Sequence, residues 1–452
     1  MDPACPASEI GVNVLRAADG STTQSLGDLP LLPPGTSQAS YGPFSACGDF
    51  DGIIVLGGPA ALDPEDTYYS KTKSYRQSLM MFIDYVNKDR GGLAVAGLRY
   101  GLRIHWVGDS SAFNFVTNAT AHAIRNLGAD FVFPSYGSTA TALVSKQAFA
   151  ENTIMLSWAS AGTGPHSQNN LSFGLRPLMS ENIRPAIRAI AAAADAIDAG
   201  TAASSDRCAA PGCKASIKVG TLSVNRGINL IGARFVAQQA VSSGLAVATG
   251  TNEVGDVCCP SAGCCAWGTD YVGEEPLTVV VEQGASIDDV INKLQILQNA
   301  GVNVVFTVAN HLHETWMFME ALERMDFSPL ATVSTFAVET ELHQSRVEGG
   351  WWQGEYLIGA VPWHRTVNSY GAFSQTSSAD WADLYEARWQ GETPDTGAAA
   401  AYAMACVLGA AIETASSMDT DEVAAALRDI DLTEFFVRAR FNEDGQILRA
   451  TR

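Results

Sequence analysis

The sequence has little positive charge. Its 452 residues contain 28 lysines and arginines against 48 aspartates and glutamates, which gives a formal net charge of −20. Such a field repels the phosphates of nucleic acids and anionic membrane surfaces, and no basic cluster interrupts it. The sequence therefore predicts no nucleic-acid partner.

Long apolar runs are also absent. No window reaches the roughly 18 to 20 apolar residues that a membrane-spanning helix needs. The nearest candidate, residues 398–412, is shorter and contains Gly409, so we interpret it as a buried helix and expect no direct membrane insertion. The N-terminus, MDPACPASEI, lacks the basic and apolar segments of a secretory signal. Either the protein is cytosolic, or a signal peptide or membrane anchor has been removed from this chain.

Familiar catalytic motifs are missing as well. Gly57-Gly58-Pro59 follows an apolar run but lacks the spacing of a dinucleotide fingerprint and the lysine of a phosphate loop, so it predicts a plain turn. No GxSxG nucleophile elbow occurs. The most metal-like residues are His311, His313 and Glu314, although Met317 stands where a zinc hydrolase would have its second helical histidine. A zinc-dependent hydrolase using these three residues is the alternative function, and otherwise we expect no enzyme and no cofactor.

Six of the nine cysteines crowd one region, a pattern that favours disulfides and an oxidising compartment. Adjacent cysteines without a nearby histidine suit zinc poorly, so we predict disulfides that stabilise surface insertions near residues 201–215 and 251–273. The protein is accordingly expected to be extracellular or periplasmic, secreted or at the cell surface. Cys406 lies in an apolar helix and is predicted to be a free core thiol. The six clustered cysteines are Cys208, Cys213, Cys258, Cys259, Cys264 and Cys265.

Residues 1–50 are rich in proline, glycine and serine without periodicity, and we interpret them as an irregular leader. From residue 51 onward, short apolar runs alternate with amphipathic segments. This alternation is typical of parallel sheets covered by helices on both faces. It occurs in two series, so the sequence predicts an α/β protein with two doubly wound parallel-sheet lobes.

Small hydroxylated residues follow two successive predicted strands of the first series. Carboxyl ends of parallel strands form the edge where open α/β sheets bind ligands, and hydroxyls and free helix amides there suit a carboxylate. Ordinary helix capping explains Ser138 and Ser160 about equally well. The residues concerned are Ser135, Ser138, Thr139 and Thr141 in the first loop, and Ser157, Ser160 and Thr163 in the second.

Several segments together resemble the type I periplasmic binding protein fold, in particular the leucine/isoleucine/valine-binding branch. They are Gly58-Pro59 with the helix ending NKDRGG, GADFVFPSYGSTATALVSKQAFAENTIMLSWASAG at residues 128–162, KVGTLSVNRGINLIGARF, LQNAGVNVVFTVANHLHETWMFMEALERM, and RFNEDGQI. The resemblance runs in consistent order from about residue 51 to the end. It consists of many weak similarities, and the leader and the cysteine-rich insertions lie outside it.

The resemblance implies two lobes joined by a three-stranded hinge. Lobe 1 would comprise residues 51–177 plus 358–435, and lobe 2 residues 178–357 plus 436–452. It also implies non-catalytic binding of a small carboxylate- or amide-bearing molecule in an interlobe cleft. The protein would be a solute receptor for transport or the ligand-binding region of a cell-surface sensor, with a membrane permease or a receptor's transmembrane region as partner.

The resemblance also implies which residues of this sequence would contact the ligand. In the family, the first lobe holds the ligand's carboxylate, and an aromatic residue of that lobe covers the ligand. Tyr68 and Tyr69 stand near the place of that aromatic residue, although packing at a helix N-terminus explains them equally well. The second lobe departs from the family's aromatic and acidic residues, so an α-amino-acid ligand is not implied. The predicted ligand-binding residues are Ser138, Thr139, Ala159, Ser160, Gly162, Tyr68 and Tyr69 from lobe 1, and Ile228, Asn310, His311, Thr335 and Phe336 from lobe 2, with Glu339 nearby.

Overall fold

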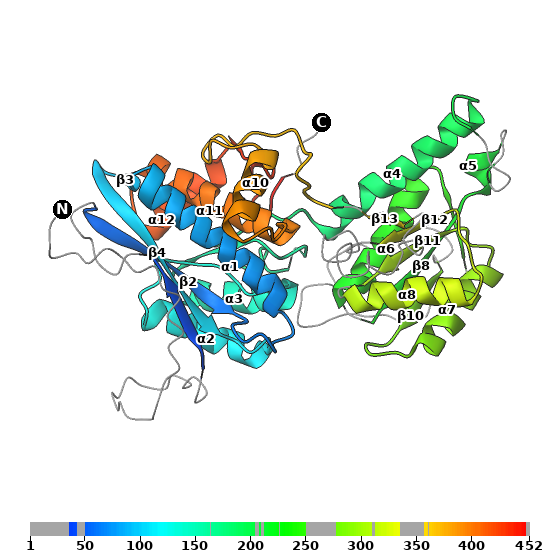
Figure 1. Cartoon of the computed structure of the whole chain (residues 1–452), viewed down its shortest axis with the longest axis horizontal. Coiled ribbons are helices and arrows are strands. Elements are labelled where there is room, and N and C mark those ends of the chain that lie inside the picture. Colours follow the sequence, from blue (N-terminus) through cyan, green and yellow to red (C-terminus); the bar gives the residue numbers. More distant parts are fainter. Residues whose placement is uncertain are drawn as a thin grey trace. The chain divides into compact units, whose positions relative to one another are not determined.

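The computed structural model describes residues 36–42, 50–162, 164–203, 208, 212–225, 227–249, 277–309, 312–334, 357–359 and 361–448. The chain divides into two compact units (Figure 1). Unit 1 comprises Met1–Pro177 and Trp363–Arg452, and unit 2 comprises Leu178–Pro362. Each unit has its own sheet and its own hydrophobic core.

Unit 1 is built on a mixed sheet with the strand order β1-β4-β2-β5-β6-β7, in which β3 also pairs with β4. Strands β2, β4, β5, β6 and β7 run parallel, whereas β1 and β3 pair antiparallel with β4. The strands are β1 Gln38–Tyr41, β2 Gly52–Ala60, β3 Leu93–Val95, β4 Leu98–Gly108, β5 Phe131–Val132, β6 Ile154–Ser157, β7 Ser172–Gly174, and the separate pair β14 Leu432–Thr433 and β15 Arg438–Ala439. The helices are α1 Tyr69–Asp84, the π-helical η1 Tyr85–Asp89, α2 Phe113–Arg125, α3 Ser138–Ala150, α10 Ser378–Arg388, α11 Thr396–Ala415 and α12 Thr420–Asp429.

Helices cover both faces of this sheet (Figure 1). Successive strand residues point to opposite faces, so Phe131 packs in the core beneath α1 and α11, whereas Val132 packs against α2 and α3. Both side chains are buried. This two-sided burial explains the continuous apolar strand pattern of the sequence.

Unit 2 repeats the arrangement with an all-parallel sheet in the order β10-β8-β11-β12-β13, in which β9 also pairs with β8. Val304 and Phe306 face one core, and Val305 faces the other. The strands are β8 Lys218–Val224, β9 Ala246–Val247, β10 Thr278–Val281, β11 Val304–Val308, β12 Ala331–Ser334 and β13 Leu357–Gly359. The helices are α4 Met179–Asp198, α5 Cys213–Ser216, α6 Gly227–Ser242, α7 Ile287–Asn299 and α8 Leu312–Arg324. The predicted α/β class with doubly wound parallel sheets is confirmed.

Helix α11 is the apolar segment that the sequence presents as a membrane candidate. Among the described residues it is the one helix long and apolar enough to cross a membrane. Every side chain from Thr396 to Gly409 is buried in the core of unit 1, and Cys406 is a buried free thiol. The interpretation of this segment as a core helix is confirmed.

The leader differs from its predicted irregular structure at β1. Gln38–Tyr41 pairs with β4, and its side chains alternate between partly buried and buried positions. Its outward-facing Ser40 lies 2.7 Å from Nδ1 of His105. Four residues with two polar side chains are too short and too polar a strand for hydrophobic periodicity to reveal.

The turn predicted at Gly57-Gly58-Pro59 is wrong, because all three residues continue β2 and pair with β4. A Cβ atom on Gly57 would lie 2.7 Å from Cβ of Ala129. A Cβ atom on Gly58 would lie 2.0 Å from the carbonyl oxygen of Phe133. These glycines therefore permit close approach of the neighbouring chain rather than a reversal.

The C-terminal segment also differs from expectation, since residues 436–448 group with unit 1 and not with lobe 2. Gln446 forms a parallel bridge with Gly174, and its Nε2 donates to the carbonyl oxygen of Arg176 at 2.8 Å. The Phe441 ring packs edge-on against Phe173. These contacts extend the β7 end of the unit 1 sheet.

Cys208 and Cys213, two of the cysteines predicted to form disulfides, are bonded to each other in unit 2, a pairing that the sequence left open. Both side chains are buried in the core that α4 and α6 cover. The carboxylate of Asp198 accepts the backbone N–H groups of Gly212, Cys213 and Lys214, which anchors the start of α5. Cys258, Cys259, Cys264 and Cys265 lie outside the described residues, so their pairing stays a prediction.

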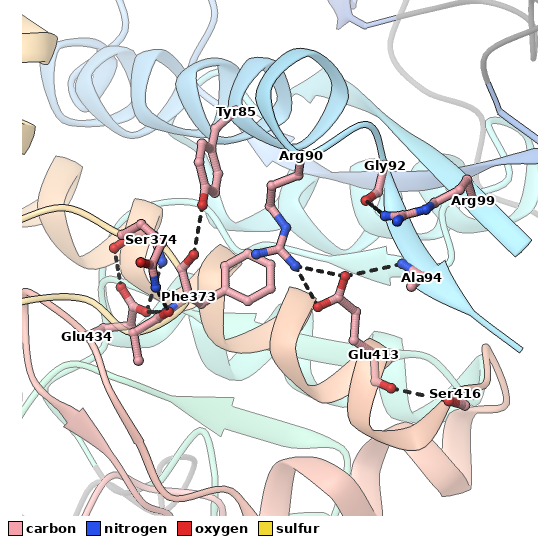
Figure 2. A network of polar contacts seen from close by, with 12 residues as sticks. Tyr85, Arg90, Gly92, Ala94, Arg99, Phe373, Ser374, Glu413, Ser416 and Glu434 are labelled. Atoms are coloured by element: carbon pink, nitrogen blue, oxygen red, sulfur yellow. Dashed lines mark hydrogen bonds and ion pairs between the residues drawn. The ribbon is translucent and has the colours of Figure 1, made fainter. Parts of the chain in front are cut away.

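The end of η1 is tied to α11 by an ion pair (Figure 2). The Arg90 guanidinium donates to both carboxylate oxygens of Glu413, at 2.9 and 2.7 Å, and stands 4.0 Å above the Phe373 ring. The Ala94 amide donates to the same carboxylate. Segments more than 300 residues apart in the sequence are thereby held together.

Glu434 lies in the same network with a fully buried side chain (Figure 2). Its carboxylate accepts hydrogen bonds from the Phe373 amide at 2.7 Å, the Ser374 amide at 3.3 Å and the Ser374 hydroxyl at 2.7 Å. Burial raises the pKa of this carboxyl, and the donors from Ser374 and Phe373 oppose that rise. One side chain thus satisfies the backbone of the loop before α10.

We expect Glu434→Ala to lower the free energy of unfolding by about 3 kcal/mol, because three buried donors lose their acceptor. Urea denaturation measures the change. Glu443→Ala, at an exposed turn position, is the control and should change stability by less than about 0.5 kcal/mol. A loss below about 1 kcal/mol for Glu434→Ala would contradict this role.

His166 provides a pH test of the same unit. Its imidazole is buried beside Gly174, and burial lowers its pKa from 6.5 to about 4. The unfolded chain binds this proton more readily, so the stabilisation is complete above about pH 6.5 and is lost as the pH falls towards 4. His166→Gln should reduce the stability difference between pH 7.5 and pH 5 by about 2 kcal/mol. Urea denaturation at both pH values checks this, with exposed His364→Gln as a control that leaves the difference unchanged.

Candidate ligand-binding rim

The parallel strands β2, β4, β5 and β6 of unit 1 all end at one edge of the sheet. The loops that follow them comprise residues 61–68, 109–112, 133–137 and 158–162. We call these loops, together with the first residues of α1, α2 and α3, the rim. In open α/β sheets this is the edge at which ligands bind.

The structure brings Ser138 and Ser160 together at the rim, although 22 residues separate them in the sequence. The Ser160 hydroxyl donates to Oγ of Ser138 at 3.3 Å, and it also accepts the Gly162 amide at 3.3 Å. Ser160 is fully buried, whereas Ser138 is partly exposed. The two hydroxyls predicted to bind a carboxylate are therefore neighbours, and their role in binding stays a prediction.

Helix capping does not explain Ser138. It is the first residue of α3, and the N-cap position is taken by Gly137, which has a positive φ of 97° and provides no side-chain cap. Thr141 reaches back to the carbonyl oxygen of Gly137 at 2.9 Å. The first turn of α3 thus presents backbone N–H groups and the positive end of the helix dipole without a side-chain acceptor.

The remaining predicted residues of the rim have different surroundings. Thr139 is exposed and Ala159 is buried, and the Ala159 carbonyl accepts a long hydrogen bond of 3.4 Å from Arg176. Tyr68 packs against Tyr136 with ring centroids 5.5 Å apart. The Tyr69 ring instead lies under the Arg76 guanidinium, at 5.5 Å, so of the two tyrosines it is Tyr68 that joins the Tyr136 ring.

Asp109 is a rim residue that the sequence analysis did not select. It follows β4 with a fully buried side chain, and its Oδ1 accepts the Ser111 amide at 2.9 Å. Burial raises the pKa of this carboxyl, and Ser135 and Ser111 oppose the rise. Ser110 and Ser111 both have positive φ, at 50° and 54°, which is strained backbone for serine. The position of Asp109 directly after β4 is the sequence signal that could have identified it.

In unit 2 the structure identifies Asn229, on the first turn of α6. Its side chain is fully buried, and neither Oδ1 nor Nδ2 has a hydrogen-bond partner among the described residues. A buried amide without partners is unfavourable by about 1 to 3 kcal/mol, so such a group calls for a ligand or a water molecule. Asn229 follows Ile228 in the sequence. Ile228 is a predicted ligand-binding residue whose side chain lies outside the described residues.

Asn310, His311, Thr335, Phe336 and Glu339 also lie outside the described residues, so their roles stay predictions.

Of the three residues of the zinc alternative, the structure describes His313 and Glu314, whereas His311 lies outside the described residues. His313 is exposed on α8, whereas the adjacent Glu314 is 2% exposed and faces the interior. Among the described parts of the chain, no group of three histidine, cysteine, aspartate or glutamate side chains is placed to hold a metal ion.

Residues 261–452 match a family model described as a periplasmic binding protein. No curated protein sequence matches the chain significantly.

Solved structures of similar architecture are solute-binding proteins. A leucine-binding protein from Thermotoga maritima has 13% identity and a TM-score of 0.60, over 87% of this chain and 92% of that protein. A branched-chain amino acid transporter substrate-binding protein from Streptococcus pneumoniae, in complex with isoleucine, has 14% identity and a TM-score of 0.61, over 87% and 93%. A solute-binding protein of an ABC transporter from R. palustris, in complex with benzoate, has 12% identity and a TM-score of 0.61, over 88% and 91%. The chain therefore has the type I periplasmic binding protein fold, as its sequence resemblance implies.

Proposed function

We propose that this protein is a non-catalytic receptor that binds a small solute bearing a carboxylate or an amide. The observation that carries the proposal is the Ser138–Ser160 hydroxyl pair at the uncapped N-terminus of α3. Hydroxyls, free backbone amides and the helix dipole together suit an anionic oxygen pair. The matched family and the similar structures are binding proteins, and the isoleucine and benzoate of two of them each carry a carboxylate.

Asn229 supports an additional polar contact from unit 2, because its amide can both donate to and accept from a ligand. The proposal retains the interlobe cleft and the contacts expected from Ile228, Asn310, His311, Thr335 and Phe336. Closure of two lobes on a ligand would convert binding energy into a conformational signal.

The proposed setting is the periplasm or the cell exterior, with a membrane permease or a receptor's transmembrane region as partner. The disulfide Cys208–Cys213 supports this setting, because disulfides persist in oxidising compartments. Several similar structures are substrate- or solute-binding proteins of ABC transporters, which favours a permease.

The test is isothermal titration calorimetry with isoleucine and benzoate, preceded by a thermal-shift screen of amino acids, short amides and organic acids. Ser138→Ala and Ser160→Ala should each weaken binding of a stabilising carboxylate by about 10-fold to 100-fold, because a charge-assisted hydrogen bond is lost. Ser78→Ala, a buried hydroxyl on α1, is the matched control and should leave affinity unchanged.

Two results would reject the proposal. Unaltered affinity in both serine variants would exclude the hydroxyl pair as the anchor. Substrate turnover together with stoichiometric zinc in metal analysis would instead favour the hydrolase that uses His311, His313 and Glu314.

The variant Asn229→Leu distinguishes a role of Asn229 in ligand binding from a role in stability. Leucine has a similar size and removes two polar atoms that have no hydrogen-bond partner in the described part of the chain, so the free energy of unfolding without ligand should stay equal or rise by up to about 1 kcal/mol. Affinity for the ligand identified in the screen should fall at least 10-fold if the amide contacts it. Denaturation and calorimetry on the same preparation measure both quantities. A destabilised variant with full affinity would show that Asn229 has a structural role.

A further inference from the structure

The rim carries aromatic side chains in addition to its serine hydroxyls. An aromatic residue stands in the loop, or at the start of the helix, that follows each of the parallel strands β2, β4, β5 and β6: Tyr68, Phe113, Tyr136 and Trp158, respectively. Phe113 is 44% exposed, and Tyr68 and Tyr136 are partly exposed, whereas Trp158 is buried behind them. Apolar rings are thus accessible beside the proposed carboxylate anchor.

Two of these residues belong to a repeated pattern. Tyr136-Gly137-Ser138 follows β5, and Trp158-Ala159-Ser160 follows β6. Because β5 and β6 are adjacent parallel strands, the loops that follow them lie next to each other. The hydroxyls lie 3.3 Å apart, and the ring centroids of Tyr136 and Trp158 lie 5.9 Å apart. Each hydroxyl is therefore accompanied by a ring two residues earlier.

The rings are held in place before any ligand arrives. Trp158 donates from Nε1 to the carbonyl oxygen of Pro134 at 2.9 Å and stacks on Tyr75, with centroids 4.7 Å apart and an interplanar angle of 12°. A Cβ atom on Gly397 would approach Trp158 to 2.8 Å, so α11 supports the indole closely. Tyr136 packs on Trp158, and Tyr68 packs on Tyr136 at 5.5 Å. Such preorganisation lowers the entropic penalty of stacking a ligand.

We infer that the ligand of this rim is an aromatic carboxylic acid, whose ring packs against Tyr136 and Tyr68 while its carboxylate meets Ser138 and Ser160. This inference rests on the proposed function and narrows its substrate class. In an aryl carboxylate the ring is bonded directly to the carboxylate. One small ligand can therefore contact the serine hydroxyls with its carboxylate and the tyrosine rings with its own ring. Aromatic pairs contribute about 0.5 to 1.5 kcal/mol beyond area burial, or roughly 2-fold to 10-fold in affinity for each ring contacted.

Rings close to acidic side chains can also bind a quaternary ammonium group. The rim contains Asp109, and the loop before α1 carries Asp63 and Asp66. The Tyr68 and Tyr136 rings, however, pack directly on each other at 5.5 Å and 44°, which leaves no space between them for a methylated cation. The geometry favours stacking of a flat ring over caging of a cation.

The experiment compares size-matched ligands by calorimetry. Benzoate should bind at least 5-fold more tightly than cyclohexanecarboxylate, which has the same carboxylate and ring size without aromaticity. Leucine and glycine betaine complete the panel and should bind more weakly than benzoate. Tyr136→Leu and, separately, Tyr68→Leu should each lower the preference for benzoate by about 2-fold to 10-fold while leaving cyclohexanecarboxylate affinity within about 2-fold. Tyr370→Leu, at an exposed tyrosine before α10, is the matched control and should retain the preference.

The outcomes distinguish this inference from the function on which it rests. Equal or tighter binding of cyclohexanecarboxylate, leucine or glycine betaine overturns the aromatic assignment and leaves the carboxylate receptor intact. Retention of the full benzoate preference in both tyrosine variants overturns the assignment of the rings. Failure of all four compounds to bind the unaltered protein overturns the carboxylate anchor together with the aromatic assignment.

Discussion

The parallel pairing of β2 with β4 on one side and β5 on the other determines where the chemistry of unit 1 can lie. Register places Gly52–Ala60 beside Tyr100–Gly108 and Leu56 beside Phe131. Because these strands and β6 run in one direction, their loops emerge at the same edge. Residues that are dozens of positions apart in the chain thereby become neighbours at the rim.

This pairing requires two positions of β2 to be without a side chain. Gly57 and Gly58 let the strand approach Ala129 and the backbone of Phe133 more closely than any Cβ atom would allow. A side chain at Gly58 would push β2 away from the loop that follows β5 and carries Tyr136, and one at Gly57 would push it away from Ala129, just before β5. The sheet and the rim are therefore constrained by the same two glycines.

The rim is connected to the core by Trp158, whose indole stacks on Tyr75 of α1 and faces Gly397 of α11. Helix α11 belongs to the part of unit 1 that the chain completes only after passing through unit 2. It is fastened to the end of η1 by the Arg90–Glu413 ion pair and to the sheet by apolar packing. Orientation of the rim thus depends on a segment more than 200 residues away in the sequence, which explains why no local motif marks it.

Local sequence determined the alternation of strands and helices, the buried character of α11 and the two hydroxyl-bearing loops of Ser138 and Ser160, because apolar periodicity and strand ends are visible over a few residues. Tertiary structure alone decided that Gly57 and Gly58 extend a strand, that Gln38–Tyr41 completes the sheet edge, and that residues 436–448 belong to unit 1. It also decided which rings pack together, that Asp109 is buried, and that Asn229 is buried without a hydrogen-bond partner among the described residues. These properties arise from contacts between segments that are distant in the sequence. Such contacts produce no periodic pattern of apolar residues, so local sequence does not predict them.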